Sequence, residues 1–219
     1  MIITAISDLH GNLINIPKCD ILLIAGDVCP TYNHNIFFQK SWLKNDFSKW
    51  LSNIDAKYII GIAGNHDFIA EKDHSFMKEL PWIYLQDENI IIDKVKIHGS
   101  PWTPQFFDWA FMKEDHELEK YWDLIDDDTD ILVTHGPPRG ILSIGGRNEE
   151  AGCISLMKRI KKLWNLKLHV FGHLHGSRGV YHETNNQRIF SNVTIVNEMY
   201  DPVYEPYTVD LYFEQMRVH

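Results

Sequence analysis

The chain has 219 residues, of which 44% are apolar and 23% are charged, and its formal net charge at pH 7 is −9. Such a length and composition are typical of a folded protein with a sizeable core, and they exclude a disordered or fibrous chain. Because an acidic surface repels polyanions, we expect no stable binding to nucleic acid.

The predicted elements alternate between buried strands and amphipathic helices. Five strands are nearly continuous in apolar residues, as in a sheet covered on both faces, and in chain order they are 2–7, 20–26, 57–64, 130–136 and 167–173. Three helices are predicted from apolar residues at three-to-four spacing, over 36–54, 114–125 and 153–164. This alternation indicates an α/β layered fold.

The tail of the chain has a different pattern. From about Arg188 to Phe213 it has the composition of successive strands, broken by Pro202 and Pro206. We therefore expect part of the sheet structure to be antiparallel. The chain has no repeat or linker, which favours a single domain over residues 1–219.

Each of the five predicted strands ends in polar residues that can bind metal. In chain order these segments are DLHGN at 8–12, GD at 26–27, GNHD at 64–67, HGPP at 135–138 and GHLH at 172–175. In an open α/β sheet, sites form beyond the carboxyl ends of the strands. Alone, each segment has an ordinary explanation as a turn, and a single buried histidine such as His169 is usually a core residue. Together, in this order, they indicate a metal site.

The residue types of these segments favour particular ions. Carboxylate, amide oxygen and imidazole suit borderline divalent ions, and the three cysteines lie outside the segments, which argues against a thiolate zinc site.

The order of the segments closely resembles that of the calcineurin-like metallophosphoesterase superfamily. Within it, GSPWTP at 99–104, HGPPRGIL at 135–142 and the Pro-rich end of the chain look like the small metallophosphoesterase-domain-containing, class III phosphodiesterase-like proteins. The resemblance implies a four-layer α/β/β/α sandwich of mixed sheets with two divalent metal ions at its edge. Manganese is the first candidate, and iron, zinc, cobalt, nickel and magnesium are the alternatives.

The same resemblance implies a role for each polar residue of the segments. One ion would be held by Asp8, His10 and His175, the other by Asn65, His135 and His173, and both by Asp27. His66 is implied to be catalytic, acting on the leaving-group oxygen as a general acid rather than as a ligand. Asp67 could orient His66, or it could only cap the helix that follows.

Departures from the superfamily narrow the expected substrate. The chain has GDVCPTY at 26–32 where the protein phosphatases have GDxVDRG, so the arginine of that motif is missing. It also lacks room for the DNA-binding domain of the related nucleases. We therefore expect a phosphodiesterase of small molecules, nucleotides or cyclic nucleotides foremost. The alternatives are a phosphomonoesterase of small molecules, or a catalytically weak nucleotide-binding or scaffold module of the same fold.

Two further segments could contact a substrate. Trp102, Phe106, Phe107 and Trp109 form an aromatic cluster in which a base could stack, with Trp102 as the candidate residue, although such a cluster can equally be a packed loop core. Arg147 precedes a predicted helix and could meet a phosphate there, or lie in a solvated turn.

The sequence also predicts a compartment. The first residues lack the basic start of a secretory signal, and Asp8 interrupts their apolar run. No apolar run approaches the roughly 18 residues that a membrane span requires. Cys19, Cys29 and Cys153 are odd in number and without CxxC spacing, as reduced thiols are. We expect a cytoplasmic protein without membrane contact. Its oligomeric state is not predicted.

Overall fold

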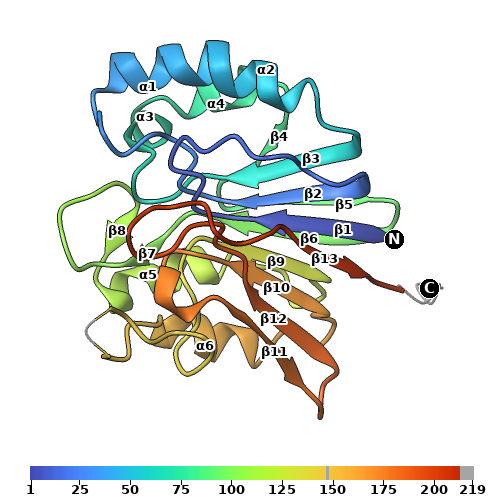
Figure 1. Cartoon of the computed structure of the whole chain (residues 1–219). Helices are drawn as coiled ribbons and strands as arrows, with labels where there is room; N and C mark the ends of the chain where they lie inside the picture. The colour runs from blue at the N-terminus through green and yellow to red at the C-terminus, as the bar shows by residue number, and fades with distance from the viewer. Residues whose placement is uncertain (147, 213–219) are drawn as a thin grey trace.

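The computed structural model describes residues 1–146 and 148–212. Two sheets face each other and helices cover their outer faces, which makes four layers (Figure 1). The helices over the first sheet are α1 (Ile36–Trp42), α2 (Ser48–Leu51), α3 (Phe68–Lys72) and α4 (His74–Glu79), and those over the second are α5 (Asp115–Trp122) and α6 (Ile154–Ile160). The predicted α/β/β/α sandwich of mixed sheets is confirmed.

The first sheet is parallel except at one edge. Its order is β13 (Tyr207–Asp210), β1 (Ile2–Ile6), β2 (Cys19–Ala25), β3 (Ala56–Ile62) and β4 (Ile83–Tyr84). Strands β1 to β4 pair in parallel, whereas β13 runs antiparallel to β1 with Ile3 opposite Val209. The carboxyl ends of β1, β2 and β3 therefore lie at the same edge.

The second sheet has a parallel centre between two antiparallel edges. Its order is β11 (Gly179–Glu183), β12 (Arg188–Asn192), β10 (Leu168–Phe171), β9 (Ile131–Thr134), β6 (Val95–Ser100) and β5 (Glu88–Ile92). A short parallel pair, β7 (Thr103–Pro104) and β8 (Met112–Lys113), lies apart. The predicted antiparallel pairing of the tail is confirmed for β13, but between β12 and β13 the chain makes only isolated bridges at Thr194 and Val196.

The apolar strand runs follow from burial on both faces. On β2, Leu23 packs between the sheets with Ile62 and Val170, whereas Leu22 faces the core under the helices with Phe47. Because successive side chains of a strand point to opposite faces, a strand buried on both sides must be apolar throughout.

The predicted helices form, with some differences in extent. Residues 36–51 are helical throughout, since a π-helical stretch, Leu43–Phe47, joins α1 and α2. Helices α5 and α6 fall inside the predicted ranges 114–125 and 153–164. No bounds were predicted for the short helices α3 and α4, although a helix was expected after Asp67. Within the residues that the structure describes, no helix has the length and apolar character to cross a membrane.

Candidate metal centre

The strand ends of both sheets supply the expected ligands. Loops after β1, β2 and β3 of the first sheet and after β9 and β10 of the second converge on one edge of the sandwich. The seven expected ligands on these loops are Asp8, His10, Asp27, Asn65, His135, His173 and His175. The structure brings all seven together, so the site spans both sheets.

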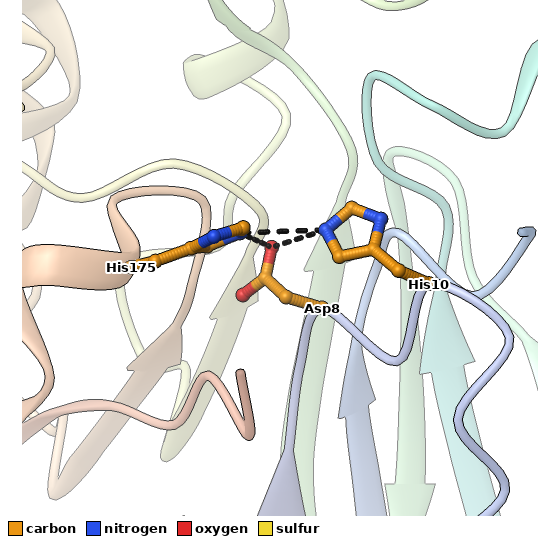
Figure 2. A group of neighbouring side chains, drawn as sticks. All are labelled: Asp8, His10 and His175. Carbon is orange, nitrogen blue, oxygen red and sulfur yellow. Dashed lines mark hydrogen bonds and ion pairs between the residues drawn. The ribbon is translucent and has the colours of Figure 1, made fainter. Parts of the chain in front are cut away.

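One half of the site joins the loop after β1 to the loop after β10. Nε2 of His175 lies 3.5 Å from Oδ1 of Asp8 and 3.3 Å from Nε2 of His10 (Figure 2). Nε2 of His10 lies 3.9 Å from the same Asp8 oxygen. Nδ1 of His175 donates to the carbonyl of Asn197 at 3.2 Å, so the nitrogen that faces Asp8 and His10 carries no proton in the neutral ring.

The other half joins the loop after β3 to the loops of the second sheet. Nε2 of His135 lies 2.9 Å from Oδ1 of Asn65, and its Nδ1 donates to the carbonyl of Ala25 at 2.8 Å. The ring of His173 lies beside that of His135, with centroids 5.1 Å apart. The backbone N–H of His173 donates to both oxygens of Asp8, which ties the two halves together.

Asp27 lies between the two halves. Its Oδ2 is 3.8 Å from Nε2 of His10 and 3.3 Å from Nε2 of His135. Its Oδ1 accepts the backbone N–H of His66 at 2.7 Å, which fixes the carboxylate. One carboxylate thus faces imidazoles of both groups, as a bridging ligand would.

The backbone at these residues is strained. Four expected ligands have φ in the left-handed region: 57° at Asp8, 44° at His10, 53° at Asp27 and 68° at His173. Each such non-glycine conformation costs on the order of 1–3 kcal/mol, and such residues cluster at functional sites. The strain turns these side chains away from the strand direction and toward the common edge.

Two glycines leave room for the carboxylates. A Cβ atom at Gly172 would lie 2.1 Å from Oδ2 of Asp8, and one at Gly64 would lie 2.3 Å from Oδ1 of Asp27. Real side chains never approach this closely, so each position must be glycine for the carboxylate to sit where it does. These two glycines are the first residues of the GHLH and GNHD segments.

The charged groups of the site shift one another's pKa values. Burial opposes ionisation of Asp8 and Asp27, but contacts with His175 and His135 respectively outweigh it and lower the pKa of each carboxyl group. Burial also disfavours the charged form of His135, yet the Asp27 carboxylate raises the pKa of that ring to about 9. Burial lowers the pKa of His10 to about 4. The site therefore holds two carboxylates that attract positive charge.

These residues fit a divalent metal centre. Neutral imidazole nitrogens and carboxylate oxygens are acceptors, and here the facing Nε2 atoms of His10 and His175 lie 3.3 Å apart beside a carboxylate. Ligand atoms of Asp8, His10 and His175, and likewise of Asp8, Asp27 and His135, all lie within 4.8 Å of one another. A cation would satisfy these acceptors together, and the oxygen and nitrogen donor set suits the ions named above.

His66 lies at the site without belonging to either half. Its Nε2 is 4.0 Å from Oδ2 of Asp27, and its ring packs against Trp109 at 4.4 Å. The third metal-compatible triple, His10, Asp27 and His66, includes it. Its role as an acid rather than a ligand is taken up below as a proposal.

Asp67 braces the site and does not contact the ring of His66. Its carboxylate accepts backbone N–H groups of Val28, Cys29 and Gly64 at 2.8–3.2 Å. It thereby joins the loop after β2 to the loop after β3. Burial, with the charge of Asp27, raises the pKa of Asp67 to about 6. Asp67 therefore does not orient the ring of His66 directly. Its side chain does not cap the following helix either, because it makes no capping hydrogen bond to α3.

A cavity of about 220 Å³ opens over the site. It is lined by site residues, by aromatic rings and by one carboxylate, and the members used below are His66, Phe106, Trp109, Glu198 and Tyr200. Tyr200 has a φ of 65° and sets its ring edge-on to His10 at 4.8 Å and to His175 at 5.2 Å. Sequence reasoning missed Tyr200 and Glu198, since nothing local marks the Pro-rich tail as part of a site.

The two residues expected to contact substrate have different outcomes. Trp102 is only 8% exposed, stacks on Tyr121 with centroids 4.0 Å apart and donates from Nε1 to Asp87 at 2.9 Å. The structure does not bring Trp102 to the cavity. Of the two alternatives, Trp102 is therefore part of a packed loop core and not a stacking residue of the cavity. Trp109 of the same loop lines the cavity instead. Arg147 lies outside the described residues.

Known proteins resemble this chain over the whole site. A family model described as calcineurin-like phosphoesterase matches residues 1–177, which contain all seven expected ligands. Metallophosphoesterase domain-containing protein 1 of Homo sapiens is 31% identical over 240 residues, covering 94% of this chain and 69% of that protein. A probable rhamnogalacturonate lyase C of Emericella nidulans is 34% identical over 197 residues, covering 81% of this chain and 17% of that protein. Among solved structures, an NAD nucleotidase of Haemophilus influenzae matches 96% of this chain and 44% of its own, with 15% identity and a TM-score of 0.45.

Proposed function

The chain belongs to the calcineurin-like phosphoesterase family, and on that premise we propose that it is a dinuclear-metal phosphodiesterase of small molecules. The observation that carries the proposal is the position of Asp27, whose Oδ2 faces His10 of one half and His135 of the other. A carboxylate so placed can serve two ions at once. The proposed ligands are those expected from the sequence, and manganese is the first ion to test.

In this proposal some residues of the chain bind the ions and one donates a proton. The ions, when bound, would polarise the phosphoryl oxygens and acidify the attacking water. Asp8 and Asp27 supply the negative charge that holds them, and the histidines must be neutral to ligate, so binding weakens in acid. His66 faces the cavity beside Asp27 without being needed by either half. We assign it the proton donation to the leaving-group oxygen.

The charge of the residues that line the cavity supports a phosphodiester rather than a phosphomonoester as the substrate. Among the cavity-lining residues that the structure describes there is no lysine or arginine, whereas Glu198 places a carboxylate there. A phosphomonoester carries up to two negative charges near neutral pH and a diester only one. With no lysine or arginine among these described lining residues, the less charged ester is the better match.

The aromatic rings of the cavity support a nucleotide as the substrate class. Phe106 and Trp109 line one side, and their ring centroids are 5.5 Å apart. Aromatic faces stack on any nucleobase, each contact contributing about 1–3 kcal/mol. A cavity of about 220 Å³ admits only part of such a ligand, so the base would extend along the exposed ring of Phe106.

A screen with reconstituted protein tests the proposal. Protein stripped with a chelator and reloaded with manganese should hold two ions per chain by elemental analysis. It should then hydrolyse cyclic nucleotides and nucleotide diesters with higher kcat/KM than nitrophenyl phosphate. A monoester turned over faster than every diester would favour the phosphomonoesterase alternative. Two bound ions without any turnover would favour the scaffold alternative.

A further inference from the structure

The backbone of His66 is fixed by one residue of another loop and by one residue of helix α1. Its N–H donates to Oδ1 of Asp27, and its carbonyl accepts the side-chain amide of Gln39 at 2.7 Å. Gln39 belongs to α1, is fully buried and accepts the backbone N–H of Ile69 at 3.0 Å with its other amide atom. Helix α1 therefore holds His66 and the first turn of α3 through one side chain.

The segment just before α1 reaches the imidazole itself. Nε2 of His34 lies 3.3 Å from Nδ1 of His66. The ring of His34 packs on Phe68 with centroids 5.0 Å apart. The next residue, Asn35, caps α1 by accepting the backbone N–H of Phe37 at 2.9 Å. The cap orders the backbone beside His34, and although His34 is exposed, its ring touches those of both Phe68 and His66.

The contact matters because of how a neutral imidazole carries its proton. One ring nitrogen bears the proton and the other accepts, and the partner of one nitrogen decides which. In His66, Nδ1 faces His34, whereas Nε2 lies 4.0 Å from Asp27 at the floor of the cavity. A proton useful to a leaving group must therefore sit on Nε2.

We propose that His34 is a positioning residue that donates its Nε2–H to Nδ1 of His66 and so keeps the proton of His66 on Nε2. This inference rests on the proposed function, in which the leaving-group oxygen takes that proton as its bond to phosphorus breaks. The ring of His66 is left as an imidazolate, and solvent returns to Nε2 the proton that was released when the attacking water ionised. His34 keeps its own proton throughout. The sequence suggested Asp67 as the residue that orients His66. Its carboxylate instead accepts three backbone N–H groups.

Two variants of His34 separate hydrogen bonding from packing. His34→Phe keeps a ring against Phe68 but removes the donor, whereas His34→Gln keeps an N–H donor. His182→Phe is the matched control, because His182 lies on the edge strand β11. Metal content should stay at the wild-type level in all three. With an alkyl leaving group, His34→Phe should lower kcat by about tenfold or more, a part of the 10²–10⁴ typical of a lost general acid.

The leaving group supplies an internal control. Turnover of a bis-nitrophenyl phosphodiester, whose leaving group needs no proton, should be nearly unchanged in His34→Phe, and KM should be unchanged for both substrates. His34→Gln should recover most of the lost kcat. In a His66→Ala background, His34→Phe should cost nothing further. An equal loss with both leaving groups, or a further loss in that background, would overturn the proposal.

A measurement without turnover tests the tautomer directly. Nitrogen-15 NMR of the imidazoles in metal-free protein, with His66 assigned from the His66→Ala spectrum, should show the proton of His66 on Nε2 in wild type. His34→Phe should shift it toward Nδ1. A proton on Nδ1 in wild type, or no change in the variant, would refute the role of His34. Lack of any turnover by metal-loaded wild type would instead refute the proposed function.

Discussion

Strand β10 and the loop that follows it carry two histidines in very different surroundings. His169, in the middle of the strand, is fully buried, packs between Phe171 and Phe190 and has Thr134 as its polar partner at 2.8 Å. His173, just past the end of the strand, has a φ of 68°, lines the cavity and faces His135. Desolvation lowers the pKa of both rings to about 3.

The difference shows that burial alone does not make a site. Both rings are kept neutral, as a metal ligand must be, yet only the end of the strand meets the loops of four other strands. The middle of β10 lies between apolar layers that stabilise the fold. Just past its end, the backbone of His173 is strained, and this conformation places the ring at the site. The following predictions test this division between the middles and the ends of the strands.

The largest expected effect lies at the strand ends, in Asp27→Asn. The amide can still accept the N–H of His66, but it removes the charge that serves both ions. We expect kcat/KM to fall by about 10³-fold or more, since metal stabilisation of charge is worth several kcal/mol. Elemental analysis should show fewer than two manganese ions per chain. Asp55→Asn, at an exposed carboxylate paired with Lys18, is the control and should match wild type.

In the middle of β10, Leu168→Ala should act on stability instead. Leu168 is fully buried between the sheets, and removing such a side chain costs about 2–5 kcal/mol. Urea denaturation of the metal-free protein should show this loss. At low denaturant, where the variant is folded, metal content and kcat should equal those of wild type. Loss of metal from folded protein would contradict the division.

An intermediate effect is expected from Trp109→Ala. If a base stacks on this ring, KM for nucleotide substrates should rise by the equivalent of about 1–3 kcal/mol, while a diester without a base is little affected. Trp102→Ala is the informative control, because Trp102 is buried against Tyr121 and should affect stability rather than KM. A rise in KM for nucleotides in Trp102→Ala, with no change in Trp109→Ala, would instead identify Trp102 as the stacking residue.

The most gradual effect, spread over several pH units, concerns His169. Burial lowers the pKa of this ring from 6.5 to about 3. Between these two pH values the ring is protonated in the unfolded chain and neutral in the folded chain. Stability should therefore be complete above about pH 6.5 and fall as the pH drops toward 3. His169 contributes a slope of up to about 1.4 kcal/mol per pH unit. His169→Gln should make denaturation curves between pH 7 and pH 4.5 less pH-dependent by this amount. An unchanged slope would show that His169 is not kept neutral by the fold.

Much of the site is local in the sequence. Each ligand-bearing segment directly follows its own apolar strand, and parallel strands place their ends at a common edge. For this reason Asp8, Asn65 and His175 could be expected together from the sequence alone. The order of the segments resembles that of the family, and the four-layer fold was expected from that resemblance. The ligand roles, the single domain over 1–219 and the compartment stay predictions.

Only the tertiary structure decided which other side chains reach the site. Trp102 and Trp109 belong to one aromatic loop, and long-range contacts with Asp87 and Tyr121 turn Trp102 inward while Trp109 meets His66. The contact of His34 with His66 spans 32 residues of chain. The direction of a side chain in a loop is set by such distant partners, because a loop lacks the fixed period that a strand or helix imposes on its neighbours.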